Sequence, residues 1–209
     1  MYRICICGPD GAGKTTVLKL VRYLLERKFK LRTMYMWMRG THTIASLLAR
    51  ILAKFSSFRG IDIPHYNVRI PERMKSLWAF LESLSAILYL VPRLILAQVA
   101  RVDILLADRC LIDTFVWICT TLRSVKLARS PQLRLLLLVN ENIFNKTLYL
   151  TANISTLIRR KREYSLRFVL YQVAIYNVLS RYLGYTKIDT TSDNVVRTAQ
   201  RTLQTLELA

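Results

Sequence analysis

A glycine-rich stretch near the amino end, Gly8 to Thr16, limits the folds open to this chain more than any other feature. It reads Gly-Pro-Asp-Gly-Ala-Gly-Lys-Thr-Thr and fits the phosphate-loop pattern, in which a Gly and four further residues precede Gly-Lys-Thr. The apolar segment Tyr2 to Cys7 predicts a buried strand before it, and the apolar spacing of Val17 to Phe29 predicts a helix after it. A glycine loop in this position directs backbone N–H groups and the positive end of the helix at a bound anion. The stretch therefore predicts a site for a nucleoside triphosphate.

Individual residues of this stretch predict separate contacts with ATP. Gly11 and Gly13 permit backbone conformations closed to bulkier residues and allow a close approach to phosphate. Lys14 would reach the β- and γ-phosphates, and the Thr15 hydroxyl would complete the shell of a Mg²⁺ ion. A tight turn that happens to contain glycines is the alternative, and the complete pattern with its flanks argues against it. The expected ATP-binding residues of the stretch are Gly8, Asp10, Gly11, Ala12, Gly13, Lys14, Thr15 and Thr16.

Strand and helix patterns alternate along the rest of the chain. Further strands are predicted at 31–38, 103–107, 147–151 and 187–189. Helices are predicted at 43–55, 71–90, 92–100, 112–123, 131–139 and 154–183, the last broken near Tyr164, and a terminal helix is expected to be capped by Asp193. Strands separated by helices predict an α/β fold with a five-stranded parallel sheet and helices on both faces. We expect residues 1–209 to form a single domain.

The charge balance is strongly basic, with 32 Lys and Arg against 13 Asp and Glu, a formal net charge of +19. This is more than a nucleotide pocket requires and allows nucleic acid as a partner. Cations spread over solvated helix faces are the alternative, which we prefer because basic residues occur throughout the chain. The four cysteines lack zinc-site spacing and predict buried thiols in a reducing compartment, the cytoplasm. We expect no signal peptide, and the apolar regions 77–107 and 133–139 to be core elements rather than membrane spans.

Charged residues after two predicted strands extend the site. Asp108 ends the 103–107 strand, where ligands collect in open α/β sheets, and with Thr15 it would organise Mg²⁺. Arg109 follows and could clamp donor and acceptor phosphates. The alternatives are a helix cap for Asp108 and a surface ion pair for Arg109. A basic cluster then predicts a lid over about 153–167, unless it is a solvated helix face; its residues are Arg159, Arg160, Lys161, Arg162 and Arg167.

These motifs together resemble the thymidylate kinase family of nucleoside monophosphate kinases. Gly8 to Thr16, with Asp10, resembles the family's phosphate loop, and Asp108-Arg109 its Asp-Arg-Tyr motif, with Cys110 in place of Tyr. Met38 to Thr41 is similar to the family's acceptor-binding segment. Thr147 to Leu150 with Leu157 to Arg160 is similar to its fourth strand with the Arg-bearing lid, and Ile188 to Ser192 is similar to its adenine-facing segment.

The resemblance implies a phosphate-loop NTPase fold, a three-layer sandwich, and roles for particular residues. Arg39 and Arg109 would grip the monophosphate, Arg159 or Arg160 would cover the adenine or the γ-phosphate, and Asp10 would face the acceptor sugar. Thr191 and Ser192 would lie along the adenine. The implied ligands are ATP, Mg²⁺ and a nucleoside monophosphate, with dTMP favoured. Family members are commonly dimers, and the apolar region 84–96 could serve as the interface or belong to the core.

The predicted third helix departs from the family pattern. An aromatic residue and an Arg four positions later usually bind the thymine, whereas this chain has Trp78 and Glu82. An ionised carboxylate only accepts hydrogen bonds, and a buried mismatch with a thymine carbonyl would cost ~1–3 kcal/mol. Three explanations remain open: a different register, a donor supplied by Arg69 or Arg73, or an acceptor base with an amino group. A core-facing aromatic pair of Trp78 and Phe80 beside a solvent-facing Glu82 is the structural alternative.

The expected activity is direct in-line transfer of the ATP γ-phosphoryl group to a 5′-monophosphate. The acceptor oxygen is already anionic at neutral pH, so catalysis needs positioning and charge neutralisation rather than a strong base. His42 and His65 have no obvious partner, which agrees with this mechanism. The alternatives are a kinase for a nucleoside or a polynucleotide 5′ end, an ATP-dependent nucleic-acid-binding protein, and a relative that binds nucleotide without catalysis.

Overall fold

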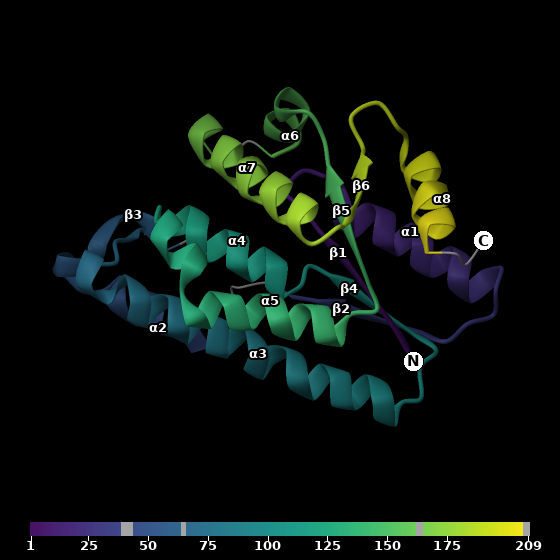
Figure 1. Cartoon of the computed structure of the whole chain (residues 1–209), viewed down its shortest axis with the longest axis horizontal. Coiled ribbons are helices and arrows are strands. Elements are labelled where there is room, and N and C mark those ends of the chain that lie inside the picture. Colours follow the sequence, from purple (N-terminus) through teal and green to yellow (C-terminus); the bar gives the residue numbers. More distant parts are fainter. Residues whose placement is uncertain (39–43, 64–65, 162–164, 207–209) are drawn as a thin grey trace. The chain divides into compact units, whose positions relative to one another are not determined.

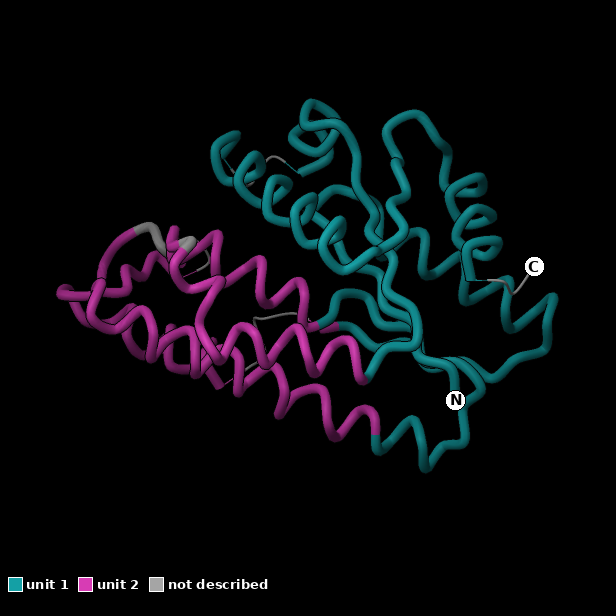
Figure 2. The backbone as a smooth tube through the Cα atoms, in the orientation of Figure 1, with its two compact units in different colours: residues 1–37, 95–110, 143–209 teal, residues 38–94, 111–142 magenta. Residues whose placement is uncertain are grey.

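A computed structural model describes residues 1–38, 44–63, 66–161 and 165–206. The chain divides into two compact units, drawn in different colours in Figure 2. Unit 1 comprises residues 1–37, 95–110 and 143–209, and unit 2 comprises residues 38–94 and 111–142.

Unit 1 is built on a five-stranded parallel sheet with the order β2-β4-β1-β5-β6 (Figure 1). The sheet confirms the five strands and the α/β class that the alternating pattern predicts. The strand bounds agree with the sequence prediction to within two residues: β1 Tyr2–Cys7, β2 Thr33–Trp37, β4 Ile104–Asp108, β5 Lys146–Thr151 and β6 Thr186–Asp189.

The register of the parallel strands brings their carboxyl ends to one edge of the sheet. In the middle, Ile6 of β1 pairs with Asp108 of β4, and Cys7 pairs with Tyr149 of β5. At the outer positions, Trp37 of β2 pairs with Asp108, and Asp189 of β6 pairs with Thr151. The segments that follow β1, β4, β5 and β6 therefore begin at the same edge, the edge where ligands bind in open α/β sheets.

Helices cover the sheet of unit 1. Helices α1 (Lys14–Arg27) and α8 (Val195–Thr205) share a buried core with alternate residues of the strands, such as Ile4 and Ile6. On the opposite face, Tyr176 of α7 (Leu166–Tyr182) stacks on Tyr149 with ring centroids 5.5 Å apart. The short helix α6 (Ile154–Arg160) precedes α7, so the predicted break in the 154–183 region is confirmed.

The cap of the last helix differs from the prediction. Asn194, not Asp193, caps α8, because the Asn194 side chain accepts a hydrogen bond from the backbone N–H of Arg197. Asp193 instead forms ion pairs with Arg197 and Arg201, one helical turn and two turns further on. Both residues are good N-caps, and the neighbouring cations are what draw the carboxylate away from the backbone.

Unit 2 is largely helical. It contains α2 (Ile44–Leu52), most of α3 (Lys75–Val99), α4 (Leu111–Thr121) and α5 (Pro131–Ile143). The predicted connection between α2 and α3 holds short elements: η2 (Ser56–Phe58), β3 (Arg59–Ile63) and η3 (Glu72–Met74), while η4 (Val125–Arg129) precedes α5. The hydrogen bonds between its helices include those from the Ala45 N–H to the Ser85 hydroxyl at 3.1 Å and from the Gln132 amide to the Ser76 hydroxyl at 3.2 Å.

Helix α3 continues through Pro92, so the predicted break between two helices near this residue is wrong. A proline inside a helix loses one backbone hydrogen bond and costs about 3 kcal/mol. The buried residues Leu90 and Ala97 lie on either side of Pro92 and anchor both halves of the helix, which offsets that cost. The sequence rule that proline starts a new helix fails here because tertiary packing outweighs it.

One face of α3 carries large apolar side chains that are exposed. The segment from Glu72 to Val99 is long and apolar enough to cross a membrane by length and composition, and 28% of its most apolar window is buried. The expectation of a core element therefore holds for one side of α3 only. The residues of this exposed apolar face are Leu77, Phe80, Leu84, Leu88, Val91, Ile95 and Val99.

Candidate functional site

The glycine-rich stretch forms a loop between β1 and α1 at the carboxyl edge of the sheet, and two of its glycines are required by close approaches. Gly8 has φ +145°, and a Cβ atom there would lie 2.0 Å from the carbonyl oxygen of Leu150 in β5. Gly11 has φ +88°, and its Cβ would lie 2.9 Å from the carbonyl oxygen of Leu157 in α6. The loop thus lies against the backbone of two later elements, which only glycine permits.

Helix α1 begins earlier than its apolar spacing predicts, at Lys14 rather than Val17, with Gly13 in the N-cap position. No side chain among the described residues caps Gly13 at the start of α1, and the backbone N–H groups of the first turn carry the positive end of the helix dipole. Lys14 is buried, and its ammonium donates to the carbonyl oxygens of Gly8 at 2.5 Å and Pro9 at 2.9 Å. An ammonium has three N–H donors, so these contacts hold the cation inside the loop and leave it able to bind a phosphate oxygen.

Asp108 at the end of β4 lies beside the start of α1, as the sequence predicts for a magnesium-organising pair. The Thr15 hydroxyl donates to Asp108 Oδ2 at 2.5 Å, and the Tyr35 hydroxyl of β2 donates to the same oxygen at 2.7 Å. Asp108 is fully buried, and its Oδ1 has no hydrogen-bond partner among the described residues. This position excludes the alternative of a helix-capping Asp108, because both donors to its side chain are hydroxyl groups.

The unpartnered Oδ1 of Asp108 is the observation that tests whether a cation fits here. A buried carboxylate oxygen without a donor carries a desolvation penalty of about 1–3 kcal/mol, and a bound ion or its water removes it. Hydroxyl and carboxylate oxygens are the ligands that Mg²⁺ takes, together with waters and substrate phosphates. Thr15 and Asp108 therefore form a donor set that fits a magnesium ion.

Arg109 reaches back to the loop. Its side chain forms an ion pair with Asp10, its backbone N–H donates to the Ile6 carbonyl at 3.1 Å, and its φ of 74° lies in the left-handed region. Burial would raise the pKa of Asp10, but the charges of Arg109, Lys14 and Lys161 outweigh it and hold that pKa below its ordinary value. Asp10 is therefore an anion at neutral pH, surrounded by cations at the carboxyl edge of the sheet.

Arg160 joins the loop to the segment after β6. Its guanidinium donates to the Gly11 carbonyl at 3.2 Å, to the Thr190 hydroxyl at 3.1 Å and to the Thr190 carbonyl at 3.0 Å. The Thr190 hydroxyl in turn donates to the Ala12 carbonyl at 3.1 Å. Arg160 of α6 and Thr190 after β6 thus both contact the glycine-rich loop.

Other predicted residues are distributed around this site. The Thr191 hydroxyl accepts the N–H of Asn153 at 2.8 Å, next to Thr190, while Ser192 is exposed. Thr16 and Arg159 are exposed too, and Arg159 directly precedes Arg160 in α6. Arg39, with the rest of 39–43, and Arg162 lie outside the described residues.

Trp78 and Glu82 lie in unit 2, where they bond to each other. The indole N–H of Trp78 donates to Glu82 Oε1 at 2.6 Å. Glu82 is buried, and this burial raises its pKa to about 7 although hydrogen bonds from Trp78 and Trp117 act in the opposite direction. The structural alternative is wrong on both counts, because Glu82 is buried rather than solvent-facing and Phe80 is 49% exposed rather than in the core.

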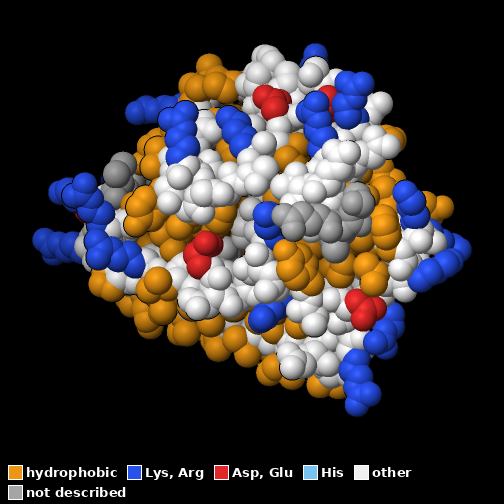
Figure 3. All heavy atoms as spheres, turned by 45° about the vertical axis from the view of Figure 1, so that its right-hand side comes forward, with side chains coloured by type: hydrophobic (Ala, Val, Ile, Leu, Met, Phe, Trp, Pro, Cys, Tyr) orange, Lys and Arg blue, Asp and Glu red, His pale blue; other side chains and the backbone are white. Residues whose placement is uncertain are grey.

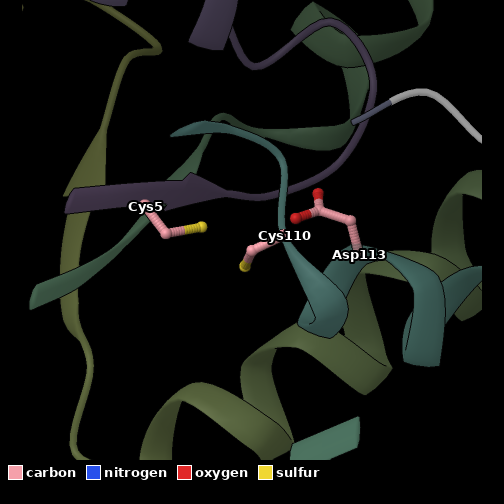
Figure 4. Close-up of side chains that lie close together, drawn as sticks. All are labelled: Cys5, Cys110 and Asp113. Atoms are coloured by element: carbon pink, nitrogen blue, oxygen red, sulfur yellow. The ribbon is translucent and has the colours of Figure 1, made fainter. Parts of the chain in front are cut away.

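Cys110, the residue that departs from the family's Asp-Arg-Tyr motif, lies near Cys5 of β1 (Figure 4). Asp113, the third residue labelled there, belongs to unit 2. The two sulfur atoms are within 4.8 Å of each other and both side chains are fully buried. All four cysteines lie in the described ranges, are buried and form no disulfide, as expected for thiols in a core.

Two residues of the site were missed by the sequence prediction. Tyr35 binds Asp108, and Thr190 binds both Arg160 and Ala12. Tyr35 is the middle residue of β2, and its contact depends on the pairing of β2 with β4, for which the sequence offered no signal. Thr190 follows β6 at the same sheet edge and belongs to the Ile188–Ser192 segment, so its neighbourhood was predicted but its contacts were not.

A comparison with protein-family models gave no match, and a search of curated protein sequences gave none either.

Proposed function

We propose that this protein is an ATP-dependent nucleoside monophosphate kinase with a phosphate-loop NTPase fold, and that dTMP is its favoured acceptor. The proposal rests on the arrangement of unit 1 at the carboxyl edge of its sheet and on the resemblance of its motifs to thymidylate kinases. It assigns phosphate binding to the loop from Gly8 to Thr16, metal binding to Thr15 and Asp108, and acceptor binding to Arg109 and Asp10.

The contact between Arg109 and Asp10 carries the proposal. A hydrolase of the phosphate-loop class needs the loop and the metal, whereas a phosphotransferase also needs cations for a second phosphate group. A guanidinium has five N–H donors in a planar fork, enough to bind a carboxylate and a phosphate together. The Asp10 ion pair holds this fork beside the loop that contains Lys14, where an acceptor phosphate would meet the γ-phosphate of ATP.

In the proposed reaction, an oxygen of the acceptor 5′-monophosphate attacks the γ-phosphorus of ATP. The bond between that phosphorus and the β–γ bridging oxygen breaks, so the products are a nucleoside diphosphate and ADP. The attacking oxygen is already anionic, and no residue of the chain has to remove a proton. Lys14 neutralises charge on the donor phosphates, Arg109 neutralises and orients the acceptor, and Arg159 adds cationic charge from α6 while Arg160 fixes the loop.

A Mg²⁺ ion, when bound, would supply positive charge that offsets the charge of the ATP phosphates. Thr15 and Asp108 would hold it, because Oδ1 of Asp108 is a buried acceptor without a partner in the described part of the chain and Thr15 donates its proton to Oδ2. The Thr15 oxygen then keeps its lone pairs for the cation.

A coupled ADP-release assay over the common ribo- and deoxynucleoside monophosphates tests the proposal. We expect ADP release to depend on the monophosphate, to be fastest with dTMP, and to equal the diphosphate formed, as measured by chromatography. The Lys14→Ala variant is the negative control for contaminating kinases. An ATP turnover that no monophosphate changes would contradict the proposal, and preferred use of a base with an amino group would assign a different acceptor.

The net charge of +19 favours a second candidate function, an ATP-dependent nucleic-acid-binding protein. On the face shown in Figure 3, Lys and Arg side chains lie in several separate groups and outnumber the acidic side chains. Separate groups are more typical of solvated faces than of one continuous binding track. Filter binding to single- and double-stranded nucleic acid at two salt concentrations tests this candidate, because phosphate contacts make the affinity fall steeply with salt. Tight, salt-sensitive binding without monophosphate turnover would favour it over the kinase.

A further inference from the structure

The hydroxyl of Tyr35 is a part of the site that the resemblance does not assign. Tyr35 pairs with Leu106 of β4, two residues before Asp108, and its ring packs against the core of unit 1. From this rigid position its hydroxyl donates to Asp108 Oδ2 at 2.7 Å. The same oxygen accepts the Thr15 hydroxyl at 2.5 Å.

The two hydroxyl donors give the two oxygens of the Asp108 carboxylate different roles. Each carboxylate oxygen accepts about two hydrogen bonds, so Thr15 and Tyr35 together occupy Oδ2. Oδ1 is left as the buried acceptor without a partner among the described residues. The carboxylate cannot rotate about its Cβ–Cγ bond without breaking both hydroxyl contacts, and Oδ1 is therefore held in one direction.

We propose that Tyr35 is a positioning residue for the magnesium ion of the bound nucleotide, acting by holding Asp108 with Oδ1 turned toward the metal and its waters. The inference rests on the proposed function of the site. It differs from a purely structural role for Tyr35, in which the ring fills space and the hydroxyl is dispensable.

The Tyr35→Phe variant keeps the ring and removes the hydroxyl. The measurement is the affinity for ADP by titration calorimetry, once with Mg²⁺ and once with EDTA, together with Mn²⁺ binding to the protein–ADP complex by electron paramagnetic resonance. We expect the affinity for ADP in EDTA to stay within twofold of wild type, and the affinities for MgADP and for Mn²⁺ to fall ~10-fold, the size typical for losing a hydrogen bond to a charged group.

Tyr149→Phe is the matched control, because it removes another tyrosine hydroxyl from the same sheet, one that contacts Asn177 at 3.3 Å. It should leave the metal dependence unchanged. In an Asp108→Asn background, Tyr35→Phe should add nothing to the loss of Mn²⁺ affinity, since both changes act through one contact.

The possible results distinguish a failure of the proposed function from a failure of the role of Tyr35. Wild-type protein that binds no nucleotide would refute the proposed function. Wild-type protein with metal-dependent binding, combined with a Tyr35→Phe variant of the same metal dependence, would refute the role of Tyr35 alone. An equal loss of ADP affinity with and without metal would show that the hydroxyl is only structural and would overturn the inference as well.

Discussion

Replacing Glu82 by glutamine should remove a large pH dependence from the stability of this protein. Glu82 has its pKa raised from 4.5 to about 7 by burial, so the folded protein keeps the carboxyl proton at pH values where the unfolded chain has released it. Below pH 4.5 both states are protonated and the contribution to stability is complete. Between pH 4.5 and about 7 the free energy of unfolding falls by about 1.4 kcal/mol per pH unit, a total of about 3 kcal/mol.

Glutamine does not titrate, and its carbonyl oxygen still accepts the indole N–H of Trp78. The free energy of unfolding of Glu82→Gln, relative to wild type, should therefore rise by about 3 kcal/mol between pH 4.5 and pH 8, most of it below pH 7.5. Urea unfolding followed by circular dichroism at four pH values in this range measures the difference, and other titrating groups cancel in the comparison.

Glu72→Gln is the control, because the Glu72 side chain is 80% exposed and contacts only the nearby Lys75 in the described structure. Its free energy of unfolding should follow that of wild type at every pH. If wild type and Glu82→Gln show parallel pH profiles, the pKa of Glu82 is not raised in the folded protein, and Glu82 is not buried beside Trp78 as described.

Three further predictions concern the loop and the helix face. Lys14→Ala or Arg109→Ala should lower kcat by about 10²–10³-fold, as expected when transition-state charge loses its counterion, with an unchanged circular dichroism spectrum; near-normal turnover in both would remove these residues from the reaction. Gly8→Ala should lower the free energy of unfolding by about 3 kcal/mol, because its Cβ would overlap the carbonyl of Leu150, and an unchanged urea midpoint would contradict the close approach. The exposed apolar face of α3 predicts a homodimer in sedimentation equilibrium that Leu88→Glu converts to a monomer; Leu88 is 50% exposed, and a monomeric wild type would refute the prediction.

Much of the fold was predictable because strands and helices of unit 1 carry simple periodic signals. The runs at Tyr2–Cys7 and Ile104–Asp108 are short, apolar and followed by glycine or charge, and both became central strands. Two predictions failed where local rules compete with packing. Pro92 was expected to separate two helices, and Asp193 was expected to cap α8 in place of Asn194. The packing around Pro92 is not visible in a local pattern, whereas Arg197 and Arg201, four and eight residues after Asp193, were a usable local signal.

The candidate site was predictable where the order of the strands and helices alone brings two residues together. Thr15 and Asp108 meet because parallel strands bring their carboxyl ends together, a property that follows from the order of elements. Tyr35 was missed because the contact depends on β2 lying next to β4, and the order of strands in a sheet is not given by their order in the sequence. The mutual contact of Trp78 and Glu82 was not predicted, although their four-residue spacing places the two side chains side by side on one helix.

The central position of β1 in the sheet determines how long this strand is without pairing partners during synthesis. β1 is synthesised before both of its neighbours in the sheet, β4 and β5, and Thr190, which holds Ala12, comes 178 residues after Ala12. At synthesis rates of about 5–20 residues per second, the loop waits roughly 10–40 s for its last support. During that interval an apolar, β-favouring segment has no sheet to enter, so chaperones that shield nascent apolar segments should matter more for this protein than for one whose strands pair soon after their synthesis.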